Sequence, residues 1–408
     1  MTRRMRTYAE EPRGLAQARF RTIVGAAPTA AQKVSGLSLP VVLAIAAIAA
    51  NILVSANLLF ALGIQYSAPG GNPLVKFHPG TYLAALSFLT MLWERRSPIV
   101  TLRQALRDEP LLFFYLAMMT CCLGFALVSN GSSGAGVYVE SFMPAAFLGI
   151  VLLRSTPRSG RLVGCVLMAL FLMNVLLVFV ETALQTHFIP IYLGDRAMVE
   201  PPGEFRSAAL YDHPLTAAQM TAMCVFLLLA HRSRPLARSA ALVACLVGLL
   251  AIGGRTALVA TVGALVLWGT ASLTVRFFAR RLTATDVAAS VAAAIIVPAT
   301  FAVLLATTSV GGRIAARFYW DESANERTIQ WKILGLIDLR DALFGISYDR
   351  LAELTYQLGL RFPFADIENF WLLMFLNLGA AGYVFFLLGF FALLFRLWQF
   401  PSPAARAL

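Results

Sequence analysis

The stretch SAALVACLVGLLAIGGRTALVATVGALVLWGTASLTV, residues 239–275, contains one charged residue, Arg255. Another arginine lies directly before the stretch and one lies directly after it. A helix that spans a membrane needs about 20 apolar residues, so this stretch is too long for one span and suits two. Gly253 and Gly254 permit a sharp turn between the two spans. By the positive-inside tendency, the flanking arginines lie in the cytoplasm and Arg255 lies on the opposite side of the membrane.

The composition extends this pattern to the whole chain of 408 residues. Hydrophobic residues make up 59% and charged residues 13% of the sequence, whereas soluble globular proteins carry roughly 25% charged residues. The sequence therefore predicts an all-α fold, a polytopic transmembrane helical bundle of about ten spans. The predicted spans are residues 39–63, 78–93, 110–128, 138–153, 162–182, 214–230, 239–254, 256–275, 287–310 and 369–397.

The predicted spans also divide the chain into regions. We expect a basic cytoplasmic segment at 1–38, a bundle of about nine spans at 39–310, a large and partly helical periplasmic loop at 311–368, a last span at 369–397 and a cytoplasmic tail at 398–408. With both termini in the cytoplasm, most lysines and arginines fall on the cytoplasmic side. The net charge of +12 therefore reflects membrane topology, and we expect no nucleic acid as a partner.

Sequence patterns for a metal, for ATP or for a cofactor are absent. The chain has no Gly-Lys-Ser/Thr phosphate loop, no HExxH and no DxD pair, and its four histidines are scattered. The five cysteines all lie within apolar runs, which is typical of small buried hydrophobic residues. We expect neither a metal nor a cofactor.

Arginines on the outer side admit two interpretations each. A guanidinium at membrane depth is expensive unless an anion accompanies it. Arg255 either reaches the interface and pairs with a lipid phosphate, or it binds a phosphate-bearing lipid substrate through bidentate contacts. Arg327, in the 311–368 loop, is either ordinary surface charge beside Glu326 or a second cation of a diphosphate clamp. Arg206, in the outer segment 183–213, is either structural or a group that binds the sugar of a substrate.

Carboxylates and a histidine on this side are equally open. Glu368 either caps the last helix or acts as general base toward a sugar hydroxyl. His213, at the start of a span, is structural, a base or a sugar-binding group. Glu140 and Glu181 lie inside or at the edge of spans, where a carboxylate is usually paired or functional, and carboxylates that line a central cavity would favour a transporter.

Several of these segments resemble motifs of one family. Residues 249–258 (LLAIGGRTAL) resemble an apolar hairpin with arginine at its turn, and 327–346, from Arg327 through Trp331 to LFGI, resemble an arginine–aromatic–glycine order in a large periplasmic loop. Residues 368–382 (ENFWLLMFLNLGAAG) resemble the helix that follows this loop. The family is the O-antigen ligase and Wzy-type polysaccharide polymerase superfamily, and the resemblance covers roughly residues 200–390, including an R…HP element from Arg206 to Pro214.

The resemblance implies a metal-independent membrane glycosyltransferase on the periplasmic face of a bacterial inner membrane. Its donor would be an undecaprenyl-diphosphate-linked oligosaccharide, held among membrane lipid. The resemblance implies diphosphate binding by Arg255 and Arg327, catalysis by Glu368 or, second, His213, and substrate binding by Arg206, Asn369 and Trp331.

One departure from the family pattern bears on the reaction. Ligases carry a histidine where this chain has Glu368, so we prefer a repeat-unit polymerase of a surface polysaccharide or exopolysaccharide over a ligase. The alternatives are an O-antigen ligase that transfers the glycan to another acceptor, and a flippase or transporter of the lipid-linked oligosaccharide. A chain-length regulator and a flippase are the protein partners that the resemblance suggests.

Overall fold

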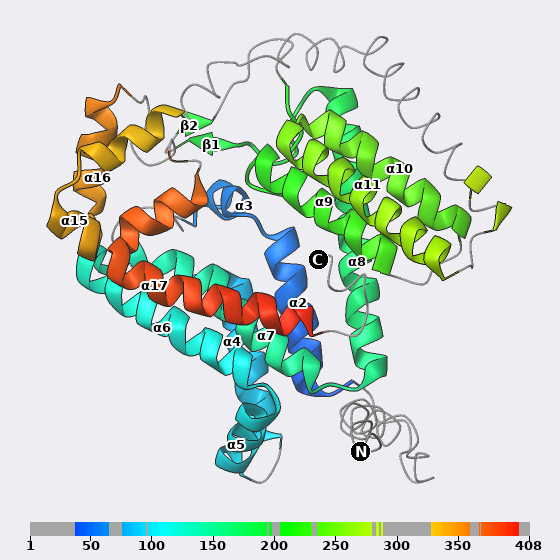
Figure 1. The fold of residues 1–408 in the computed structure, drawn as a ribbon, viewed down its shortest axis with the longest axis horizontal. Coiled ribbons are helices and arrows are strands. Elements are labelled where there is room, and N and C mark those ends of the chain that lie inside the picture. The colour runs from blue at the N-terminus through cyan, green and yellow to red at the C-terminus, as the bar shows by residue number, and fades with distance from the viewer. Residues whose placement is uncertain are drawn as a thin grey trace, which may run out of the picture. The chain divides into compact units, whose positions relative to one another are not determined.

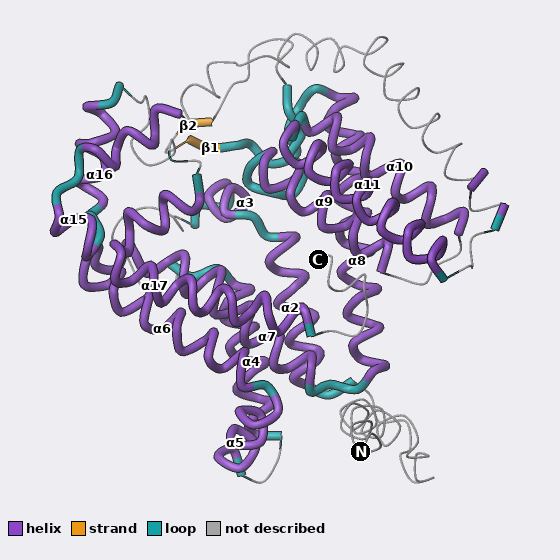
Figure 2. Tube along the Cα trace, viewed as in Figure 1, coloured by secondary structure: helices purple, strands orange, loops and turns teal. Residues whose placement is uncertain are grey.

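The computed structural model describes residues 37–64, 76–94, 97–193, 196–197, 205–230, 235–279, 283–284, 287–288, 328–359, 367 and 369–399. Contacts divide the chain into the units Met1–Ser38 and Leu39–Leu408, and every element below belongs to the second unit. Helices make up nearly all of the regular structure (Figure 2), and one antiparallel pair of two-residue strands occurs among the described residues. The predicted span 287–310 lies outside the described residues except at its first two positions.

Six of the α-helices begin with proline, whose missing N–H is harmless in the first turn of a helix. The short strands are β1 (Tyr192–Leu193) and β2 (Arg196–Ala197). The α-helices (Figure 1) are α2 (Leu39–Leu53), α3 (Ala56–Ala61), α4 (Pro79–Trp93), α5 (Pro98–Asp108), α6 (Pro110–Asn130), α7 (Met143–Leu153), α8 (Pro157–Leu184), α9 (Pro214–Ala230), α10 (Pro235–Ile252), α11 (Arg255–Phe278), α15 (Leu339–Phe344), α16 (Tyr348–Gln357) and α17 (Phe370–Trp398). Tighter or wider turns occupy Gly131–Ala135 and Trp331–Gly335, which are 3₁₀ helices, and Tyr138–Phe142, a π-helix.

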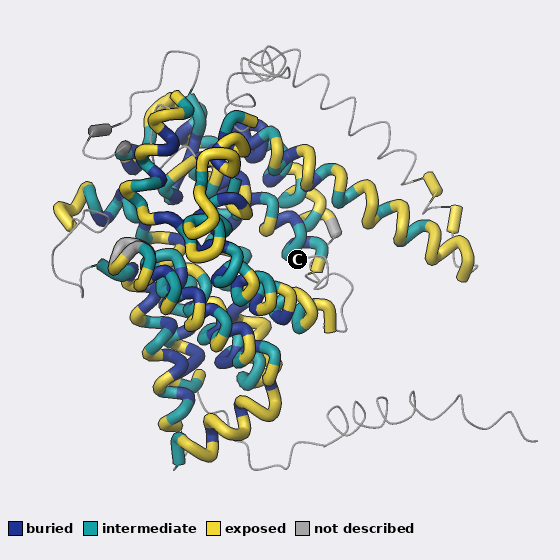
Figure 3. Tube along the Cα trace, turned by 60° about the vertical axis from the view of Figure 1, so that its left-hand side comes forward, coloured by how far each residue is buried: buried dark blue, intermediate teal, exposed yellow. Residues whose placement is uncertain are grey.

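Membrane character is confirmed by length and composition. Within the described part of the chain, four helical segments are long and apolar enough to cross a membrane, and four shorter apolar helices accompany them; the long ones are Pro110–Ser129, Pro157–Leu184, Arg255–Phe278 and Phe370–Trp398. Much of α11 is exposed (Figure 3), and the exposed side chains include Val259, Leu267 and Phe278. An exposed apolar surface of this extent is unfavourable in water and favourable in lipid. The predicted class, a helical membrane protein, is therefore correct.

The last membrane helix is broken. Gly379 interrupts α17 with φ 60° and ψ 176°. Before the break, Leu372 and Leu376 pack in a core with Ile346 of the outer loop, and after it Phe386 packs in the core that α17 shares with α6. At 1.5 Å per residue, the segment after the break measures about 28 Å, which matches a hydrocarbon core of about 30 Å. The predicted span 369–397 thus consists of a loop-facing half and a half long enough to cross the membrane.

Two glycines make this break possible. The Ile346 amide donates a hydrogen bond of 2.8 Å to the Leu376 carbonyl. Gly345, with φ 84°, lies so close to α17 that a Cβ there would be 2.5 Å from the Asn377 carbonyl oxygen. A Cβ on Gly379 would overlap the backbone of Gly345 itself. Backbone therefore packs directly on backbone, and only glycine permits that contact at these backbone angles.

Helical structure in the outer loop differs from the prediction. Ile329, Ile333, Leu336 and Ile337 recur at helical spacing, which predicts one amphipathic helix. Instead, the chain tightens into the 3₁₀ turn Trp331–Gly335 and two further helices follow. The reason is that Asp338 caps the start of a new helix. Its side chain accepts a hydrogen bond from the Asp341 amide at 2.7 Å, so α15 begins at the next residue.

The amphipathic helix α5 was not predicted. Ile99 and Leu106 are exposed, whereas Thr101 and Ala105 are buried. Only part of one face of α5 is hydrophobic. The helix therefore contains no apolar run long enough to be recognised as a membrane span.

Replacing Gly379 with alanine is expected to destabilise the protein by about 1–3 kcal/mol, because the residue needs a positive φ and its Cβ would overlap backbone atoms. Thermal unfolding of the purified protein in detergent measures the effect. Gly263→Ala is the matched control: this glycine lies inside α11, nothing lies within 4 Å of an added Cβ, and alanine there should be neutral or stabilising by up to about 1 kcal/mol. Equal unfolding midpoints for both variants would contradict the packing described.

Candidate functional site

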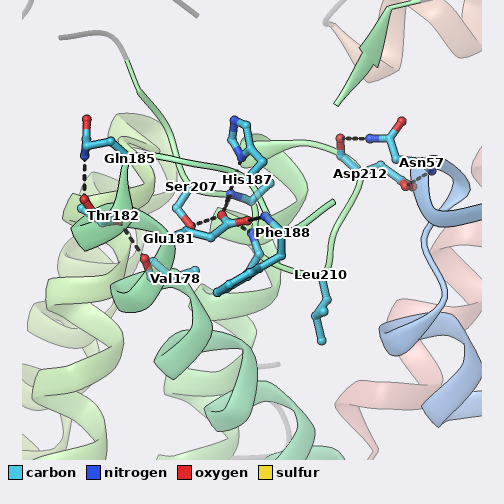
Figure 4. A network of polar contacts seen from close by, with 12 residues as sticks. Asn57, Val178, Glu181, Thr182, Gln185, His187, Phe188, Ser207, Leu210 and Asp212 are labelled. Carbon is cyan, nitrogen blue, oxygen red and sulfur yellow. Dashed lines mark hydrogen bonds and ion pairs between the residues drawn. The ribbon is translucent and has the colours of Figure 1, made fainter. Parts of the chain in front are cut away.

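A fully buried carboxylate organises the candidate site. Glu181, at the end of α8, has 0% exposure, and a buried carboxylate is tolerated only where donors satisfy it. Its two oxygens accept four hydrogen bonds, all from the segments that follow α8 (Figure 4). The donors are the Phe188 amide (2.7 Å), the Ser207 hydroxyl (2.6 Å) and the amides of Ala208 (3.0 Å) and Ala209 (2.8 Å).

The chain reverses after α8 and returns over this carboxylate. Gln185 adopts a left-handed conformation, with φ 53°, where the helix ends. His187 follows, and its Nδ1 lies 3.7 Å from Glu181 Oε2. The His187 ring also packs on Phe205, with ring centroids 4.6 Å apart and the planes at 30°. The residue that immediately precedes Arg206 is therefore held by the same group of contacts.

The Glu181 hydrogen bonds also hold a strained backbone. Ala209 has φ 51°, a left-handed conformation that costs an L-residue roughly 1–2 kcal/mol. Its amide and the amide of Ala208 both point to Glu181 Oε2. Two amides that converge on one carboxylate oxygen compensate for the strained geometry.

The side chain of Arg206 and the backbone amide of Arg255 contact the same carbonyl oxygen. The Arg206 Nη2 atom lies 3.5 Å from the Gly253 oxygen, and the Arg255 backbone N–H donates to the same oxygen at 3.0 Å. Gly253 has φ 75°, as a tight turn between α10 and α11 requires. Two arginines that are 49 positions apart in the sequence are thus attached to one turn, and both side chains are partly buried.

Gly254 seats that turn on α9. A Cβ on Gly254 would overlap the Cβ of Ala218, so the backbone of the turn lies directly on a small residue of the neighbouring helix. The contact sets how deep the start of α11, and with it Arg255, lies in the bundle.

The segment that carries Arg206 is also fixed at its far end. Asp212 accepts from the Asn57 amide at 3.0 Å through Oδ1, and its carbonyl accepts from Asn57 Nδ2 at 2.8 Å (Figure 4). Asn57 Oδ1 accepts in turn from the Tyr192 amide at 3.3 Å. Tyr211 is buried beside Asp212, and burial raises the pKa of its phenol, so it stays neutral and cannot serve as a base.

His213 is exposed and caps α9. Its carbonyl accepts from the Ala217 amide at 3.1 Å, and its ring Nδ1 accepts from the Leu215 amide at 3.2 Å. A neutral imidazole that accepts at Nδ1 carries its proton on Nε2. The other ring nitrogen is thus a hydrogen-bond donor, which suits contact with a sugar or phosphate oxygen better than proton abstraction.

The remaining predicted site residues lie toward the outer loop. Asn369 is the N-cap of α17, where Oδ1 accepts from the amides of Trp371 and Leu372 at 3.1 Å each. Trp331 is 51% exposed. Arg327 and Glu368 lie outside the described residues, so the predicted Arg255–Arg327 clamp stays a prediction.

Glu140, like Glu181, is engaged by backbone. Its Oε1 accepts from the His78 amide at 3.0 Å. Across the parts of the chain that the structure describes, no group of three or more His, Cys, Asp and Glu side chains is arranged to hold a metal ion.

The role of Glu181 as an organiser of the site, and the Asn57–Asp212 contact, were not predicted. One sequence signal was available. Ser207-Ala208-Ala209 is a run of small residues, and small residues let a backbone approach a buried carboxylate closely. Asn57 offered no comparable signal, because its partner is 155 positions away.

A compensating pair of substitutions tests the turn. Gly254→Ala should lower the thermal unfolding midpoint because its methyl group would overlap the Ala218 side chain. Ala218→Gly in the same protein removes that overlap and should recover part of the loss, although glycine in a helix alone costs about 1 kcal/mol. If the double variant loses as much stability as the two single variants together, the Gly254–Ala218 contact does not hold the turn in place.

Comparisons with protein-family models, with curated proteins and with solved structures found no match to this chain. The function must therefore be argued from the residues and their geometry.

Proposed function

We propose that this protein is a membrane glycosyltransferase that polymerises undecaprenyl-diphosphate-linked oligosaccharide repeat units of a surface polysaccharide. In this proposal the reaction takes place on the periplasmic face of a bacterial inner membrane, with ten spans and both termini in the cytoplasm. The observation that carries the proposal is the contact of the Arg206 guanidinium with the Gly253 carbonyl, in the turn where the Arg255 backbone N–H donates to the same oxygen.

A turn that carries Arg255 in its backbone and contacts the guanidinium of Arg206 suits a diphosphate. Transfer of the glycan breaks the bond between the anomeric carbon and the diphosphate oxygen, and negative charge grows on the leaving group. Fixed cations stabilise that charge in the transition state, and arginine offers paired N–H donors that match phosphate geometry. We assign this role to Arg206 and Arg255, with Arg327 as a further cation from the outer loop.

The acceptor is a hydroxyl of a second lipid-linked repeat unit, whose oxygen attacks the anomeric carbon. Its proton needs a base, for which we propose Glu368, because the Nδ1 contact of His213 makes the exposed nitrogen of that ring a donor. His213 and Asn369 then bind sugar or phosphate oxygens, and the half-exposed Trp331 offers an apolar face to a sugar ring.

The transporter alternative loses its main support. It rested on Glu140 and Glu181 as carboxylates that line a path through the membrane. Both accept hydrogen bonds from backbone amides, and Glu181 has no exposed surface. Such carboxylates suit anchoring of loops better than transport of a polar ligand. A ligase uses the same donor and differs in its acceptor, so product analysis separates it from a polymerase.

The test is oligomer formation by purified protein from a synthetic polyprenyl-diphosphate repeat unit. Wild type should produce a ladder of oligomers. Arg206→Ala and Arg255→Ala should each slow it by about 10²–10³-fold, the usual effect of removing one group that stabilises transition-state charge.

Arg340→Ala is the control. Arg340 is an exposed arginine of α15, so this substitution removes the same charge away from the turn and should leave the ladder unchanged. No ladder with wild type, or an undiminished ladder with Arg255→Ala, would overturn the proposal. Transfer onto a different acceptor with no ladder would favour the ligase.

A further inference from the structure

We infer that Glu181 is a positioning residue that holds Arg206 beside Arg255 and thereby sets the affinity of this site for a diphosphate. The inference rests on the proposed function, since it identifies what builds the cation pair. It assigns a role to a side chain that never touches the substrate.

The connection between Glu181 and Arg206 is short. Ser207, the next residue after Arg206, is completely buried and donates its hydroxyl proton to Glu181 at 2.6 Å. Two further donors, the amides of Ala208 and Ala209, follow at once. With three consecutive residues attached to one carboxylate oxygen, the Arg206 backbone has little freedom to move from the Gly253 turn.

The same segment is held from its other side. Phe205, before Arg206, packs on His187, whose Nδ1 lies 3.7 Å from Glu181 Oε2. Residues on both sides of Arg206 thus depend on one carboxylate. The four hydrogen bonds that Glu181 accepts come from three backbone amides and the Ser207 hydroxyl, so they fix the backbone of these segments.

Both carboxylate oxygens are required. Oε1 accepts from Phe188, and Oε2 accepts from the 207–209 segment. In Glu181→Gln one oxygen becomes an NH₂ group, which faces N–H donors and cannot accept from them. Either the Phe188 contact or the 207–209 contacts must therefore be lost, although size and shape hardly change.

Amide hydrogen exchange of the full-length protein tests the positioning directly. In Glu181→Gln, exchange of the peptide covering 206–210 should accelerate about tenfold or more, while α16 should keep its wild-type rate. Ser207→Ala removes a single donor and leaves the carboxylate in place. It is the second test variant in case Glu181→Gln does not fold, and exchange of the same peptide should accelerate less in it. Unchanged exchange at 206–210 in both variants overturns the inference.

Inorganic pyrophosphate is the probe for the site. Its dissociation constant, measured by titration calorimetry in detergent, should rise about tenfold in Glu181→Gln, which corresponds to one lost charge-assisted contact. In an Arg206→Ala background, the same Glu181→Gln change should have less than about a twofold effect, because a positioning residue has nothing left to position. In the ladder assay, its effect should appear as a raised KM and a lowered kcat.

Glu140→Gln is the matched control, since it alters another outer-side carboxylate that accepts a backbone amide. It should leave pyrophosphate affinity unchanged even where it lowers thermal stability. The inference is overturned, and the proposed function is not, if wild type and Glu181→Gln bind pyrophosphate with equal affinity. The same holds if the effects of Glu181→Gln and Arg206→Ala on that affinity add up in the double variant. Wild type that binds no pyrophosphate and forms no ladder overturns the proposed function and the anion-binding role together.

Discussion

A carboxylate without solvent contact imposes the geometry of the segment that follows α8 in this protein. Burial of an unsatisfied charge costs several kcal/mol, and Glu181 avoids that penalty only because the chain supplies one hydroxyl and three amides to it. These donors come from two separate stretches of the segment after α8. Satisfaction of one side chain therefore determines the course of the loop, and the loop determines where Arg206 lies.

The second constraint is close packing of backbone at glycines. Gly254 seats the α10–α11 turn on α9, and Gly345 packs on Gly379 where α17 is broken. At the first place the turn lies on the small Ala218 side chain, and at the second place backbone lies directly on backbone. The first contact positions Arg255, and the second ties the outer loop to the helix that begins after Glu368.

The positions of the long apolar helices that the structure describes followed from the sequence, because a membrane span needs a long apolar run. The predicted span 39–63 is instead two helices, α2 and α3. The turn at Gly253-Gly254 was predicted, and α10 ends and α11 begins on either side of it. α5 and the break in α17 were not predicted. α5 is only partly apolar. The residue at the break of α17 is one of 29 glycines in the chain, and contacts with segments distant in the sequence decide at which glycine a helix breaks.

The sequence by itself determined the membrane-helix class, the turn that carries Arg255 and the set of polar residues available for chemistry, since these depend on local composition and length. Only the tertiary structure decided which of them meet. Arg206 and Arg255 share the Gly253 carbonyl, and Asn57 binds Asp212. Such contacts depend on how buried polar groups are satisfied between segments far apart in the chain, which no local pattern encodes.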